Sequence, residues 1–149
     1  MKKIIISVAF ATYIFASQNG YSTHSSWLMN INSTEGRFMA VEEQLRGFDT
    51  AMVEVGYRYE ALKKALSSHN YELADYHLEK IKTAIELGYI RRSARKEASQ
   101  NYFLNSVYKE FQEALKTKND TMIINSFDNL KNSCNACHVN QKVGFIVIE

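Results

Sequence analysis

The sequence lacks several features that would place it in other protein classes. It contains no nucleotide-binding loop, no paired-glycine turn and no internal repeat, and none of its 149 residues is proline. No apolar run reaches the roughly 20 residues that a membrane-spanning helix needs. No basic stripe with interleaved aromatic residues, the pattern of a nucleic-acid-binding surface, is present. The length of the chain predicts one domain with one core. The missing apolar run predicts no membrane span in the mature form, and the missing basic stripe predicts no nucleic-acid partner.

The N-terminal residues 1–17 have the composition of a signal peptide. Lys2 and Lys3 provide a positive start, and a short apolar run over residues 4–11 follows. We expect cleavage near residue 17 and export to the periplasm; the alternative is an uncleaved anchor. The whole chain has 18 basic and 16 acidic residues, so removal of the two lysines leaves 16 of each. The small basic excess thus belongs to the export signal.

Beyond the signal peptide, residues 18–36 are rich in Ser, Asn, Gly and Thr, which predicts a loosely ordered leader. Four segments with apolar residues at helical spacing follow. Caps are expected at Asn70 and at Asn119 or Asp120, and a stop is expected near Gly88. The four expected helices cover residues 38–66, 71–88, 104–115 and 120–141.

Short connections between these helices make consecutive helices antiparallel. The predicted fold is therefore all-α: an up-down-up-down antiparallel four-helix bundle over residues 37–149. The apolar residues after 142 form a β-prone tail that either folds back over the bundle end or extends from it.

The only two cysteines lie in the pentad Cys134-Asn135-Ala136-Cys137-His138. This spacing lets two thiols add across the two vinyl groups of one haem while the adjacent imidazole reaches the iron. The pentad therefore predicts one covalently attached haem c, with His138 as an axial ligand.

Three other uses of the pentad remain as alternatives. A disulfide between Cys134 and Cys137 is compatible with export, although so short a loop gives little stabilisation. A thioredoxin-like pair begins a helix after a strand, whereas these cysteines end a helix. A zinc site needs four ligands, and the sequence offers no second cysteine pair and no histidine close to His138.

The second axial ligand is expected from the first helix. Only 11 residues follow His138, and Met122 lies 16 residues before it on the same helix, about 24 Å away. If the first and fourth helices are antiparallel, position 138 is level with position 48. Leu45 and Phe48 are then expected to pack on the distal face of the haem, and Met52 is expected to bind the iron.

Other interpretations of Met52 and of the distal ligand stay open. A methionine in a core position fills an irregular space and needs no metal. His69 and His77 are weaker candidates, because a lone histidine on a helix is more often a surface or satisfied polar group. Met39 lies beyond the expected level of the iron, and Met29 precedes the helix.

With this pentad near the end of the fourth helix, the chain resembles the small bacterial bundle cytochromes of the cytochrome c-prime type over residues 38–142. It is also similar to related short exported cytochrome-family proteins in AMVEVGYRY (51–59) and NYELADY (70–76). In the wider family a basic residue follows the haem histidine by four positions, so the resemblance implies that Lys142 contacts a haem propionate. In that family an aromatic residue often stands directly before this basic residue, whereas this chain has Gln141 at that position.

The resemblance also bears on ligation and assembly. The family contains five-coordinate members and six-coordinate members that take a methionine from the first helix, and Met52 points to the second group. Members often pair as homodimers. The missing aromatic residue before Lys142 weakens the likeness to the high-spin, gas-binding members.

These observations predict a periplasmic electron carrier that meets a redox partner protein of unknown identity. It is not expected to be an enzyme, because carboxylates such as Glu42, Glu79 and Glu110 are spread over helix faces. One alternative is a five-coordinate haem protein that binds nitric oxide or carbon monoxide. The other is a haem-free helical interaction module with a disulfide.

Overall fold

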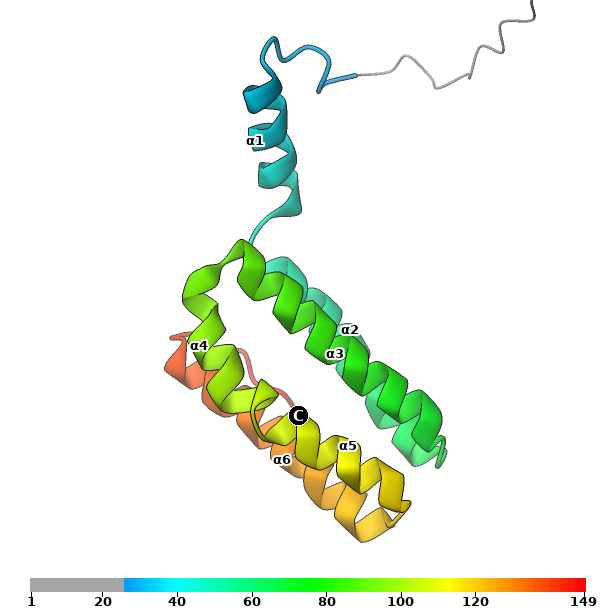
Figure 1. The fold of residues 1–149 in the computed structure, drawn as a ribbon. Helices are drawn as coiled ribbons and strands as arrows, with labels where there is room; N and C mark the ends of the chain where they lie inside the picture. The colour runs from blue at the N-terminus through cyan, green and yellow to red at the C-terminus, as the bar shows by residue number, and fades with distance from the viewer. Residues whose placement is uncertain (1–25) are drawn as a thin grey trace, which may run out of the picture.

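The computed structural model describes residues 26–149, and this part of the chain is helical without any strand (Figure 1). The all-α prediction is thereby confirmed for these residues, whereas the expected signal peptide lies outside them. None of the described helices is both long enough and apolar enough to cross a membrane. The elements are α1 (Thr34–Leu45), α2 (Phe48–Ser67), α3 (Tyr71–Arg91), a 3-10 turn (Ser93–Arg95), α4 (Lys96–Ser99), a π-helical turn (Gln100–Leu104), α5 (Val107–Thr117) and α6 (Asp120–Asn140).

Two helical hairpins make up most of the structure. α2 and α3 lie side by side along their lengths, and α5 pairs with α6 after a two-residue connection (Figure 1). α3 also contacts α5, and the Tyr71 hydroxyl donates a hydrogen bond to the Asp120 carboxylate, which joins the first turns of α3 and α6. The first turns of α3 and α6 therefore lie together at one end of the molecule.

The core lies where the hairpins meet. The Tyr59 ring of α2 stacks on Phe127 of α6 with centroids 5.1 Å apart, and Phe111 of α5 meets the same Phe127 ring edge-on. Each large apolar side chain that is fully buried contributes about 1.5–3 kcal/mol to folding. The largest fully buried side chains come from the four helices of the two hairpins: Leu62, Leu78, Ile81, Phe111 and Leu130.

The prediction of a single first helix over residues 38–66 is wrong, because the helix is interrupted between α1 and α2. Arg46 takes a non-helical conformation with φ 59° and ψ −159°. The Asp49 carboxylate accepts the Gly47 N–H at 3.1 Å and also pairs with the Arg46 guanidinium, so it stabilises the new helix start. α1 buries none of its residues and stands apart from the two hairpins (Figure 1).

Two of the expected helix starts are confirmed. The Asn70 side chain accepts the Leu73 N–H at 3.0 Å, and the Asn119 side chain accepts the Met122 N–H at 3.1 Å. Each amide satisfies one of the main-chain donors that the first turn of a helix leaves free. The starts of α3 and α6 are thus fixed by their own sequence.

The expected stop at Gly88 is wrong, because α3 continues to Arg91. Gly88 is buried against α2, where a Cβ atom would lie 2.7 Å from the Cβ of Ala51 and 2.9 Å from Cδ2 of Phe48. This glycine therefore allows two helices to approach closely rather than ending one of them.

Candidate functional site

An apolar cavity of about 620 Å³ lies between the two hairpins. Its walls come from α2, α3, the π-helical turn, α6 and the residues that follow α6. A volume of roughly 300–1,000 Å³ is usual for a site that holds a small molecule or cofactor. Apolar side chains dominate the walls, among them Val53, Val55, Ile81, Ile85, Phe103 and Ile148.

Five of the residues predicted from the sequence line this one cavity. Cys134, Cys137 and His138 come from the last turns of α6, and Phe48 and Met52 come from the first turns of α2. The end of α6 therefore lies near the start of α2, as expected from the antiparallel alignment that puts position 138 level with position 48. Met52 is also partly buried against the core.

Two predicted residues do not line the cavity. Leu45 ends α1, outside the hairpins, and is 54% exposed. Lys142 follows α6 in a left-handed conformation with φ 62° and is exposed. The break at Arg46 directs α1 away from the cavity, and the left-handed turn does the same for Lys142.

Arg46 and Arg95 line the cavity instead. The Arg46 guanidinium pairs with Asp49, which also lines the cavity and offsets its charge, so the positive charge there comes from Arg95. Arg95 lies in the 3-10 turn, and its guanidinium donates a hydrogen bond to the Gln141 side chain. No motif in the sequence marks either arginine as a site residue. The only sequence feature near Arg95 is the cluster of basic residues over 91–96, whose position in space depends on the turn that follows α3.

Cys134 and Cys137 are free thiols, and both are partly buried. Burial, followed by the neighbouring Cys137, raises the pKa of Cys134 to about 12. Burial also raises the pKa of Cys137, against a lowering effect from Arg95. Both are therefore neutral thiols near pH 7, unlike the thiolates with lowered pKa that redox-active pairs use.

The His138 ring has a defined hydrogen-bond partner. Its Nδ1 lies 2.8 Å from the main-chain oxygen of Ile146, and a carbonyl oxygen can only accept, so Nδ1 carries the proton. In the neutral ring the lone pair is then on Nε2. Histidines that bind metals usually have such a hydrogen bond on the other ring nitrogen.

The residues after α6 fold back over the cavity, and we name residues 143–149 the C-terminal strap. Its Val143, Ile146 and Ile148 line the cavity. The Asn135 side chain donates to the Ile148 oxygen at 3.0 Å and accepts the Ile148 N–H at 2.8 Å. The Tyr59 hydroxyl donates to the main-chain oxygen of Glu149 at 3.3 Å.

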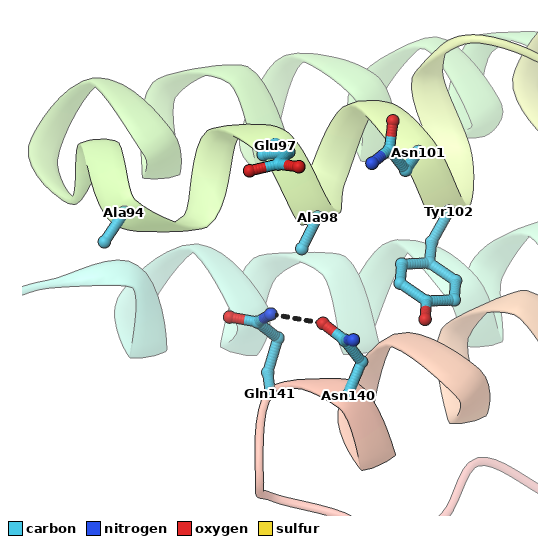
Figure 2. Close-up of a pocket in the computed structure, with 7 residues that line it drawn as sticks. All are labelled: Ala94, Glu97, Ala98, Asn101, Tyr102, Asn140 and Gln141. Carbon is cyan, nitrogen blue, oxygen red and sulfur yellow. Dashed lines mark hydrogen bonds between the residues drawn. The ribbon is translucent and has the colours of Figure 1, made fainter.

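A smaller hollow of about 380 Å³ lies beside the cavity, between the α4 region and the end of α6 (Figure 2). Its lining is mostly polar, and Gln141 donates to the Asn140 side chain at 2.6 Å. Tyr102 and Gln141 line both spaces, so they form part of the wall between them.

The π-helical turn explains how Tyr102 reaches this wall. Asn105 N–H bonds to Gln100 O at 3.0 Å, which widens the helix by one residue, and Ser133 donates its hydroxyl to the Tyr102 oxygen. As a result Tyr102 and Phe103, adjacent in sequence, both line the cavity. Such turns often occur at functional sites. The regular helix expected from Leu104 begins only at Val107.

Comparison with known proteins identifies no family: no protein-family model, curated protein or solved structure gives a significant match to this chain. Within residues 26–149, no three His, Cys, Asp or Glu side chains gather closely enough to hold a bare metal ion. A haem iron does not require such a cluster, because the protein supplies only its axial ligands.

Proposed function

We propose that this protein is an exported c-type cytochrome that carries one covalent haem and transfers single electrons. Cys134 and Cys137 hold the haem through thioether bonds, with His138 as one axial ligand and Met52 as the other. The observation that carries the proposal is that Met52 lines the same apolar cavity as the two cysteines and the histidine of the pentad, although Met52 lies on a different helix.

The four helices of the two hairpins, α2, α3, α5 and α6, form an up-down-up-down antiparallel bundle in this proposal. Its support is the close pairing within the α2–α3 and α5–α6 hairpins, together with the contact between α3 and α5. In such bundles, cofactor sites are built from side chains on facing helices. A haem between α2 and α6 fits that rule.

The chain's own residues have distinct tasks at this site. Apolar side chains exclude water, and the Nδ1–H of His138 donates to Ile146, which leaves Nε2 as the metal-binding atom. Arg95 supplies a guanidinium group, which suits carboxylates such as the haem propionates, whereas the Arg46 guanidinium is already paired with Asp49. The bound haem supplies an iron that alternates between ferric and ferrous states.

The cellular setting follows from the N-terminal segment rather than from the site. Residues 1–17 serve as the export signal, the mature protein is periplasmic, and a redox partner protein docks transiently where the haem edge reaches the surface. The protein acts as an electron carrier and not as an enzyme.

Spectroscopy of the wild-type protein tests this function. The full chain should be produced in a bacterial host with haem-attachment machinery and purified from the periplasm. We expect one covalent haem in a low-spin state that binds carbon monoxide poorly, since both axial positions are filled. A high-spin protein that binds carbon monoxide readily would instead support gas binding beside Phe48, and a haem-free protein would contradict the proposal.

A further inference from the structure

Asn135 makes an unusual pair of contacts for a residue inside the pentad. Covalent haem attachment needs the two cysteines and the histidine, and places no chemical demand on the two residues between the cysteines. Even so, the Asn135 amide binds both main-chain groups of Ile148, as donor to its oxygen at 3.0 Å and as acceptor from its N–H at 2.8 Å. This side chain therefore fixes a distant segment of the chain to α6.

The segment that Asn135 holds is the C-terminal strap, which is neither helix nor strand. The strap begins with Val143 N–H bonded to the His138 oxygen at 2.9 Å and turns with Ile146 N–H bonded to Val143 O at 2.9 Å. Beyond the turn, its main chain is held by Asn135 and by the Tyr59 hydroxyl. Asn135 provides two of these three bonds.

The strap also supplies the partner of the His138 ring. Nδ1 of His138 bonds to the oxygen of Ile146, which lies between the turn at Val143 and the anchor at Ile148. If the anchor is lost, the Tyr59 bond to Glu149, three residues beyond Ile146, still holds the end of the strap, but the two bonds nearest to Ile146 on that side are gone. The position of this oxygen, and with it the orientation of the ring, then depends on Asn135.

We infer that Asn135 is a positioning residue for the axial histidine: by anchoring Ile148 it places the Ile146 oxygen on Nδ1 of His138. This inference rests on the proposed function. A histidine that donates a strong hydrogen bond from Nδ1 is a better electron donor to its metal and favours the ferric state. The strap therefore helps to set the reduction potential.

The first experiment needs no haem. Asn135→Ala removes both bonds to Ile148, Asn135→Asp keeps the acceptor but removes the donor, and Asn132→Ala is the matched control at an exposed position on the same helix. Hydrogen exchange of the Ile148 amide in the haem-free chain should become about tenfold faster in Asn135→Ala, because its acceptor is lost. Asn135→Asp should be intermediate, and Asn132→Ala should match the wild type.

The second experiment uses the haem-loaded protein. Asn135→Ala should raise the reduction potential, with Asn135→Asp in between. In the Met52→Ala background, which should bind carbon monoxide, adding Asn135→Ala should lower the iron–histidine stretching frequency measured in the ferrous state after carbon monoxide photolysis. A haem-loaded Asn135→Ala protein with the wild-type potential, together with an unchanged frequency in the Met52→Ala background, would overturn this inference alone. A wild-type chain without covalent haem would overturn the proposed function as well, and the exchange of Ile148 would still report whether the strap is anchored as described.

Discussion

Gly88 of α3 lies so close to Ala51 of α2 that a side chain at position 88 would meet the Ala51 Cβ at 2.7 Å. It would also meet the Phe48 ring at 2.9 Å, and Phe48 forms part of the cavity wall. Close helix approach and cavity shape are therefore linked at this one position.

Gly88→Ala should destabilise the haem-free chain by about 1–3 kcal/mol, the usual effect of overpacking a close contact. Gly56→Ala is the control, because a Cβ there meets nothing within 4 Å and alanine favours a helix over glycine by roughly 0.5–1 kcal/mol. Urea unfolding followed by circular dichroism measures both changes. A Gly88→Ala protein as stable as the wild type would show that the helices separate easily.

His77 predicts a pH-dependent stability. Burial, followed by the nearby Arg58 charge, lowers its pKa from the usual 6.5, so the folded state favours the neutral ring. The stability that this preference supplies is present above about pH 6.5 and is lost as the pH falls below it. The wild type should therefore unfold more easily at pH 5 than at pH 7.5.

His77→Gln should weaken this dependence between pH 7.5 and pH 5, because no imidazole then has to be charged inside the protein. His69→Gln, at a largely exposed histidine, should retain the wild-type dependence. The difference in Tm between pH 7.5 and pH 5, measured for the wild type and both variants, gives this dependence. Equal pH dependence in His77→Gln and wild type would mean that other groups cause the acid sensitivity.

Covalent attachment predicts a mass. The purified exported protein should be heavier than its processed chain by one haem, and the haem should survive extraction with acid acetone. Cys134→Ser and Cys137→Ser should each weaken or abolish this link, whereas Asn132→Ser should keep it. Mass spectrometry of the four proteins, matured beside a known c-type cytochrome, would contradict attachment if the wild type had the mass of the bare chain.

Export predicts a new N-terminus. Because of Lys2, Lys3 and the short apolar run after them, the haem-loaded protein should begin between about residues 17 and 21 and should appear in the periplasmic fraction. N-terminal sequencing measures this directly. An intact Met1 would indicate a membrane anchor in place of a cleaved signal.

The parts of the site that could be predicted depend on regular geometry. The pentad fixes three positions on α6, and the constant rise of a helix places its end level with the start of α2, so Phe48 and Met52 could be identified. Asn70 and Asn119 were likewise predictable because a cap involves only neighbouring residues.

The parts that could not be predicted depend on irregular backbone. The apolar spacing continues from Leu45 to Phe48 without a fault, so periodicity does not reveal the break at Arg46. Arg95 reaches the cavity from a short turn, and the strap reaches it through side-chain bonds to Asn135. Helical periodicity contains no information about either arrangement.

The absorption spectrum of Met52→Ala tests the central claim most directly. Wild-type ferric protein should be low-spin with a weak near-infrared charge-transfer band, and Met52→Ala should lose the band, become high-spin and bind carbon monoxide. Met39→Ala and Met122→Ala should match the wild type, because both side chains are exposed and neither lines the cavity. If Met52→Ala keeps the wild-type spectrum, Met52 is a packing residue and the assigned ligation is wrong.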